Sequence, residues 1–136
     1  MKNHLFELIL AIKRKCLATE ERIQKQLNLS QAEFHGLLSI KPNEQLPGNT
    51  FSERMGLSPS RGSRVLWRLV SKELMRTRTN SEDRRSVVIS LTEQGKSVQN
   101  NAKESILACE GKIKASLSHE QISRIKESLQ LLEQSL

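Results

Sequence analysis

The first apolar pattern of the chain has helical spacing. It predicts a helix from Leu5 to about Leu17, because four residues there recur at intervals of four and three: Leu5, Ile9, Ile12 and Cys16. A polar segment then leads to Ser30, which has the spacing of a capping box with Glu33. The helix that begins there is expected to end before Pro42.

Two further helices are expected on either side of a glycine. Thr50 and Glu53 have capping-box spacing and predict the start of a short helix that stops at Gly56. Ser58 can cap a second helix over about residues 58–74, with a proline in its first position. A helix, a glycine turn and a second helix form the helix-turn-helix pattern.

Strand patterns follow and then give way to helices again. Residues 76–80 and 86–91 are rich in Thr, Val and Ile and predict two strands of a wing, over about residues 76–91, around the turn NSEDRR. Thr92 is expected to cap a long helix, and Ser118 a final one. The last helix has an apolar stripe that needs a partner, within the chain or from a second copy: Ile122, Ile125, Leu129, Leu132 and Leu136.

The length and the apolar content indicate one domain over residues 1–136. No apolar run is long enough to cross a membrane, and the basic cluster near the N-terminus follows the apolar stretch instead of preceding it. We therefore expect a cytoplasmic protein without a membrane partner.

The positive charge is concentrated in one part of the chain. Residues 61–85 carry eight Lys and Arg against three acids, whereas residues 92–136 carry six of each. A basic segment of this kind favours phosphate binding, because a surplus that serves solubility would be scattered.

On a helical wheel, the cations of the 58–74 helix fall on one face. Arg61, Arg64 and Arg68 share an arc with Ser60 and Lys72, and the apolar residues lie opposite. Three arginines within two turns repel one another unless an anion accepts them, and the guanidinium fork suits phosphate or guanine. Ser58, Ser60 and the free amides of the first turn add a phosphate site. A solvated basic face is the simpler alternative.

The sequence resembles the MarR (multiple-antibiotic-resistance regulator) family of winged helix-turn-helix transcriptional regulators. The resemblance extends from LSQAEFHGLLSI through MGLSPSRGSRVLWRLVSKELM to EDRRSVVISLTEQG. It implies a mainly α fold with a small β-wing, in which a winged helix-turn-helix lobe over residues 30–91 lies between dimerisation helices over residues 1–28 and 92–136. Homodimers of this type read inverted repeats in double-stranded DNA.

The resemblance also implies roles for single residues. The 58–74 helix would lie in the major groove, with Ser60, Arg61 and Arg64, and also Arg68, nearest the DNA. At the wing tip Arg85 would enter the minor groove, beside Arg84, with its position supported by Asp83. A solvated hairpin turn is the alternative for these three residues, because Asp is an ordinary turn residue.

One departure from the family pattern affects the exit of the recognition helix. Family members commonly have Lys-Gly-Leu where this chain has Lys72, Glu73 and Leu74. Because the glycine supplies a left-handed cap, a different helix exit and wing orientation are possible here.

The sequence contains candidate residues for sensing an oxidant or a small ligand. Relatives that sense organic hydroperoxides use a cysteine in the first helix together with tyrosines; Cys16 occupies a comparable region, but the chain has no tyrosine. Cys16 also falls on the apolar stripe, where burial would explain it, and a disulfide to Cys109 is a weaker alternative. Other relatives bind small aromatic anions, for which Phe34, His35 and Trp67 are candidates, but no ligand site can be assigned.

The histidines and cysteines show no metal-ligand spacing, no cofactor motif occurs, and no catalytic set is visible. The sequence therefore predicts a sequence-specific transcriptional regulator, expected to be a repressor, that a small-molecule effector or an oxidant releases. Two alternatives are a winged-helix module that binds a protein partner and a non-specific architectural DNA binder.

Overall fold

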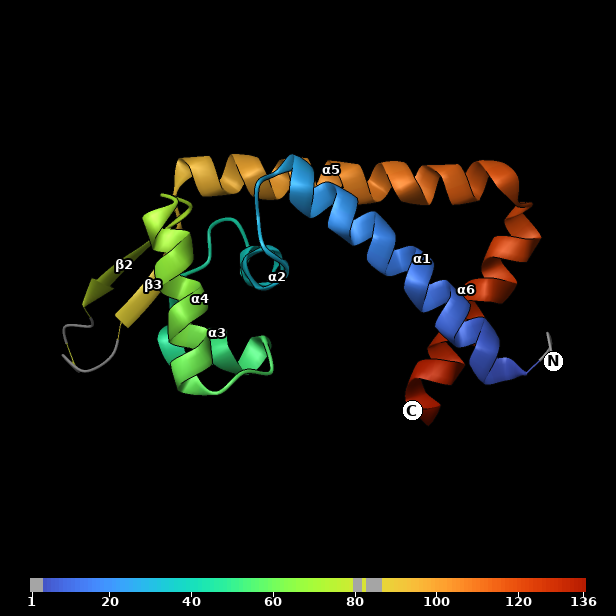
Figure 1. The fold of residues 1–136 in the computed structure, drawn as a ribbon, viewed down its shortest axis with the longest axis horizontal. Coiled ribbons are helices and arrows are strands. Elements are labelled where there is room, and N and C mark those ends of the chain that lie inside the picture. Colours follow the sequence, from blue (N-terminus) through green and yellow to red (C-terminus); the bar gives the residue numbers. More distant parts are fainter. Residues whose placement is uncertain (1–3, 80–81, 83–86) are drawn as a thin grey trace. The chain divides into compact units, whose positions relative to one another are not determined.

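The computed structural model describes residues 4–79, 82 and 87–136, and it contains helices and a small antiparallel sheet (Figure 1). Contacts divide the chain into two units, residues 1–102 and 103–136, with the boundary inside α5. The elements in chain order are α1 (Leu5–Gln26), α2 (Gln31–Leu38), β1 (Leu46–Pro47), α3 (Gly48–Arg54), α4 (Pro59–Ser71), β2 (Met75–Thr79), β3 (Val87–Leu91), α5 (Glu93–Ser116) and α6 (His119–Ser135).

The sheet of the first unit has the order β1-β3-β2, with both pairs antiparallel. Ile89 in the central strand lies opposite Leu46 on one side and Thr77 on the other. Because successive side chains of a strand point to opposite faces, one face of the sheet joins the core and the other faces solvent. The core is formed by buried residues of α2, α3, α4 and the strands, among them Phe34, Leu37, Phe51, Leu69, Met75, Ile89 and Leu91.

Three helices of this unit end in the same way, with a residue of positive φ just after the helix. These residues are Asn28 after α1, Gly56 after α3 and Glu73 after α4. After α4, the amide of Leu74 donates to the carbonyl of Leu69 and the amide of Glu73 to that of Val70, both at 2.9 Å. This is the Schellman pattern. Glu73 therefore keeps the left-handed exit, with φ 62°, although it has a side chain.

The beginning of α5 packs against this exit. The hydroxyl of Thr92 accepts from the amide of Gly95 at 2.9 Å and donates to the carbonyl of Glu73 at 2.6 Å, which confirms Thr92 as the cap of α5. A Cβ placed on Gly95 would lie 1.9 Å from the carbonyl oxygen of Leu74. A glycine is therefore required where α5 crosses the end of α4.

A buried side chain connects α5 to α2. Gln99 is 1% exposed, and its amide nitrogen donates to the carbonyls of Leu37 and Ile40 at 2.8 and 2.6 Å. These two carbonyls lie at the end of α2, where no further helical turn can donate to them. Gln99 thus provides the hydrogen bonds that the buried end of α2 needs.

The structure corrects three expectations about secondary structure. α1 continues to Gln26 instead of ending near Leu17, because Ile23 and Gln24 of its last turns are buried against the lobe. α3 begins at Gly48, so Thr50 lies inside the helix and does not cap it. The two-residue strand β1 was not expected, since a strand this short has no alternation to detect.

The expected starts of three other helices agree with the structure. Capping boxes are present at Ser30 and at Ser118, and Ser58 caps α4. α4 ends at Ser71, three residues before the expected position. Among the helices of the described residues, none is long and apolar enough to cross a membrane.

In the second unit α6 has no buried residue along its 17 positions. Large apolar side chains of this unit are exposed, including Leu107, Ile113, Leu129 and Leu131 at 51 to 66%. In proteins most helical stability comes from the packing of an apolar face, not from intrinsic propensity. We therefore expect these apolar side chains to pack against a surface of a partner.

The exit of α4 generates a stability prediction. Replacing Glu73 with Gly should raise the free energy of unfolding by roughly 1 kcal/mol, because a residue with a Cβ is strained at positive φ and glycine is not. Glu73→Ala keeps the Cβ and removes the same charge, so it should give little or no gain. Urea unfolding at one fixed protein concentration measures both variants, and an equal gain in the two would assign the effect to charge.

Candidate nucleic-acid interface

The N-terminus of α4 is organised by two serines. The hydroxyl of Ser58 accepts from the amide of Arg61 at 3.3 Å and lies 3.3 Å from the hydroxyl of Ser60. Both serines are exposed, and the first turn of α4 contains no acid. The positive end of the helix dipole is therefore available to an anion at the surface.

The two faces of α4 differ completely in character. Val65, Leu66 and Leu69 are at most 5% exposed and form its buried face. Arg61, Arg64 and Arg68 are all exposed on the other side, and among the described residues none of them has a carboxylate partner. We call these three residues the arginine face. The structure brings them together with Ser58 and Ser60 on one surface, as the helical wheel predicts.

A close contact with α3 fixes the position of α4. A Cβ on Gly62 would lie 1.9 Å from the hydroxyl oxygen of Ser52 and 3.1 Å from its Cα. Ser52 is itself buried, so it has little space to move. Gly62 is therefore explained by the crossing of the two helices.

Lys72 does not belong to the arginine face. Its ammonium lies 2.6 Å from the carboxylate of Glu33 and donates to the carbonyl of Asn28 at 2.7 Å. Burial by itself raises the pKa of Glu33, but hydrogen bonds from Lys72 and Ser30 outweigh it, so the pKa of Glu33 lies below its usual value. This ion pair connects the end of α4 to the beginning of α2, and its charge is neutralised within the protein.

Arg54 is a second cation that is already paired. Its guanidinium donates to both carboxylate oxygens of Glu44, at 2.7 and 2.9 Å, and to the carbonyl of Ser39 at 3.0 Å. The hydrogen bond from Arg54, followed by that from the amide of Lys41, lowers the pKa of Glu44 to about 2. Lys72 and Arg54 thus stabilise the lobe through ion pairs within the protein. The residues of the arginine face form no such pair among the described residues.

The strands of the wing belong to the described part of the chain, but the predicted wing tip does not. Asp83, Arg84 and Arg85 lie outside the described residues. The strands that lead to them are present, with Thr79 of β2 opposite Val87 of β3. The roles of these three residues therefore stay predictions.

Two further arginines contribute to the positive charge of residues 61–85 but were not predicted as site residues. Arg76 and Arg78 lie on β2, and both are exposed. Their side chains contact the neutral groups of Ser90 and Gln45. The alternation Met75-Arg-Thr-Arg-Thr79 was the available signal, because it places both arginines on the face opposite a buried methionine.

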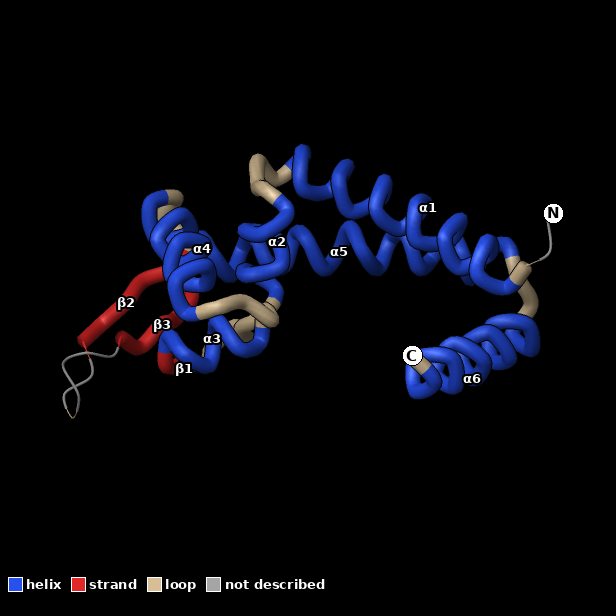
Figure 2. Tube along the Cα trace, turned by 60° about the horizontal axis from the view of Figure 1, so that its bottom comes forward, coloured by secondary structure: helices blue, strands red, loops and turns tan. Residues whose placement is uncertain are grey.

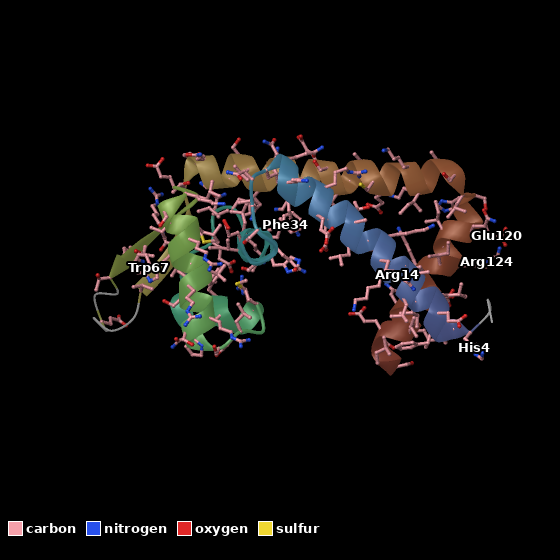
Figure 3. All side chains as sticks on the ribbon, in the orientation of Figure 1. His4, Arg14, Phe34, Trp67, Glu120 and Arg124 are labelled. Carbon is pink, nitrogen blue, oxygen red and sulfur yellow. The ribbon has the colours of Figure 1, made fainter. Side chains whose placement is uncertain are left out.

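The residues considered for sensing are not brought into one site. Cys16 is exposed in α1, which corrects the interpretation that it is buried on the apolar stripe, and Cys109 in α5 is half-buried. Phe34 is 2% exposed in the core, whereas Trp67, also labelled in Figure 3, is 50% exposed on α4 and is not a core residue. Within the described part of the chain, no group of three or more His, Cys, Asp or Glu is arranged to hold a metal ion.

Comparison with known sequences points to one family. Residues 29–87 match the MarR family. The chain is also 28% identical over 95 residues to the "Organic hydroperoxide resistance transcriptional regulator" of Bacillus subtilis (strain 168), a match that covers 70% of this chain and 65% of that protein.

Solved structures share the fold over almost the whole chain. Streptococcus pneumoniae FabT in complex with DNA has a TM-score of 0.86 at 22% identity, covering 96% of this chain and 93% of that chain. The S. aureus MepR-DNA complex has a TM-score of 0.81 at 20% identity, covering 98% and 99%. These likenesses show the winged helix-turn-helix fold. Residues 29–87, the part of the chain that matches the MarR family, lie within this fold, and members of that family are transcriptional regulators and not enzymes.

Proposed function

We propose that the chain is a sequence-specific regulator of transcription that binds double-stranded DNA as a homodimer. The arginine face is the observation that carries this proposal. Arg61, Arg64 and Arg68 are exposed on a helix whose opposite side is fully buried, and the described residues offer them no carboxylate. Like charges held this close on a rigid helix are stabilised when an external anion binds.

The chemistry of α4 suits the major groove. A helix fits that groove, and an arginine fork can donate two hydrogen bonds to O6 and N7 of guanine. Arg61 and Arg64 would reach base edges, while Ser58, Ser60 and the first-turn amides would hold a backbone phosphate. The wing would place Arg85 in the adjacent minor groove, with Arg84 on the backbone and Asp83 supporting the wing arginine.

Exposed apolar side chains support the homodimer. On α1 the side chains of Leu5, Phe6, Leu8 and Ile12 are 52 to 65% exposed, and the second unit has the apolar surface described above. Monomeric soluble proteins rarely expose so many large apolar residues close together in the sequence. A second copy would cover these surfaces, and its two-fold axis would make the operator an inverted repeat with half-sites about one helical turn apart.

Regulation by release from DNA is the finer part of the proposal. A bound repressor blocks transcription until a ligand or an oxidant weakens its hold on DNA. Cys16 is the candidate for an oxidant because it is a free cysteine in the first helix, and the relative named for organic hydroperoxide resistance supports this choice. A protein that acts on DNA in this way would work in the cytoplasm.

In-vitro selection from a random duplex library at near-physiological salt tests the function. We expect the surviving sequences to contain an inverted repeat with half-sites about 10 base pairs apart. General duplex binding without a preferred sequence would instead indicate an architectural binder. If no duplex is retained, the basic face binds another partner, such as an acidic protein surface.

The role of Cys16 is tested on the selected operator. Mild peroxide should weaken operator binding by the parent protein but not by Cys16→Ser, because a serine cannot be oxidised to a sulfenic acid. Cys109→Ser is the matched control and should respond like the parent. Equal loss in the parent and in Cys16→Ser, measured by fluorescence anisotropy, would exclude Cys16 as the switch.

A further inference from the structure

The outer face of the sheet carries two arginines on one strand. In β2, Met75 is buried and Thr77 is half-buried, whereas Arg76 and Arg78 are exposed. Because side chains alternate along a strand, both arginines point to the face opposite the core. Arg76 is paired with Ser90 and Arg78 with Val88 on β3, so the four side chains share that face.

Neutral hydrogen bonds hold both guanidinium groups. The Nε of Arg76 donates to the hydroxyl oxygen of Ser90 at 3.3 Å, and an Nη of Arg78 donates to the amide oxygen of Gln45 at 3.0 Å. Such partners restrict the side chains but leave the positive charge uncompensated. Each fork also keeps donors for another acceptor, since a guanidinium has five N–H groups.

Carboxylates close to this face are occupied elsewhere. Glu44 lines the same hollow as Arg76, but both of its oxygens accept from Arg54 and the pKa of Glu44 is lowered to about 2. Lys96 lines that hollow as a third cation, and its ammonium lies 3.1 Å from Glu93, whose side chain is 88% exposed. Within the described residues, neither Arg76 nor Arg78 has an acidic partner.

The position of the sheet relative to α4 indicates which anion could bind to its outer face. The strand β2 contacts α4, and the hairpin of β2 and β3 extends away from α3 and α4 in Figure 2. The hairpin therefore lies beside α4 and reaches past it. On a duplex that α4 reads, the phosphates nearest to the hairpin would be those beyond the bases that α4 contacts.

We propose that the outer sheet face, defined as Gln45, Arg76, Arg78 and Ser90, is a second phosphate-binding surface that holds backbone phosphates of the DNA flanking the operator. This inference rests on the proposed function. Two forks spaced along an extended strand suit a row of phosphates, whereas a single small anion needs convergent donors. The surface extends the footprint without reading bases, because phosphate contacts carry no sequence information.

The test compares two operator duplexes, one ending at the outer base pairs and one about 10 base pairs longer at each end. The parent should bind the long duplex more tightly. Arg76→Gln/Arg78→Gln should lose that advantage, about tenfold or more, and the slope of log K against log salt should fall by about 1 for each lost phosphate contact. Its affinity for the short duplex should not change.

Two matched variants accompany the double mutant. Lys13→Gln/Lys25→Gln removes the same charge from exposed positions of α1 and should behave like the parent on both duplexes. Arg76→Lys/Arg78→Lys keeps the charge and should retain most of the salt slope. If this charge-preserving variant loses the long-duplex advantage as fully as the Gln variant, the surface acts on the fold and not through phosphates.

The result that would contradict the phosphate-binding surface differs from the result that would contradict the proposed function. If the parent binds neither duplex, the proposed function fails, and this inference fails with it. If the parent binds both and the Gln variant keeps the parent's preference for the long duplex, only this inference fails. Calorimetry with inorganic pyrophosphate completes the test. If pyrophosphate binding depends on Arg76 and Arg78 while the Gln variant keeps the parent's affinity for both duplexes, the surface is a site for a free anion, and the DNA assignment is wrong.

Discussion

The lobe depends on the junction where α4 ends. Glu73 adopts a left-handed conformation there, and the chain turns from the recognition helix directly into β2. The carbonyl of Glu73 accepts from the hydroxyl of Thr92, and that of Leu74 accepts from its amide at 3.1 Å. Gly95 permits α5 to lie against the same carbonyl. One short segment therefore fixes the recognition helix, the strands of the wing and the beginning of α5 relative to one another.

The charges of this lobe fall into two classes with different physical roles. Lys72 and Arg54 are each neutralised by a carboxylate, and these pairs fix the ends of α2, α3 and α4. The arginine face, together with Arg76 and Arg78, has no such compensation in the described chain. Folding stability alone does not account for uncompensated charges on rigid elements, because they repel one another. Their arrangement is accounted for if DNA supplies the missing negative charge.

Local sequence rules predicted the elements where local physics decides. Ser30, Ser58 and Ser118 begin helices because a capping hydroxyl acts within three residues, and all three positions are confirmed. The arginine face was also predictable, since helical spacing alone determines which side chains share a face. These features need no knowledge of the rest of the fold.

Features that depend on distant contacts were missed. The extension of α1 to Gln26 follows from burial of Ile23 against the lobe, and the engagement of Lys72 by Glu33 joins residues 39 positions apart. The left-handed Glu73 was not predictable from propensity, because glycine is the expected residue at that position. Tertiary contacts hold Glu73 in this conformation, which preserves the helix exit despite the altered sequence.

Whether the arginine face reads DNA is decided by the affinity of Arg64→Ala for the selected operator. If Arg64 contacts a base, its removal should cost about 1 to 3 kcal/mol of binding free energy. Lys25→Ala removes one charge from an exposed position of α1 and should have little effect. An operator affinity that Arg64→Ala leaves unchanged, or that Lys25→Ala lowers equally, would contradict the account.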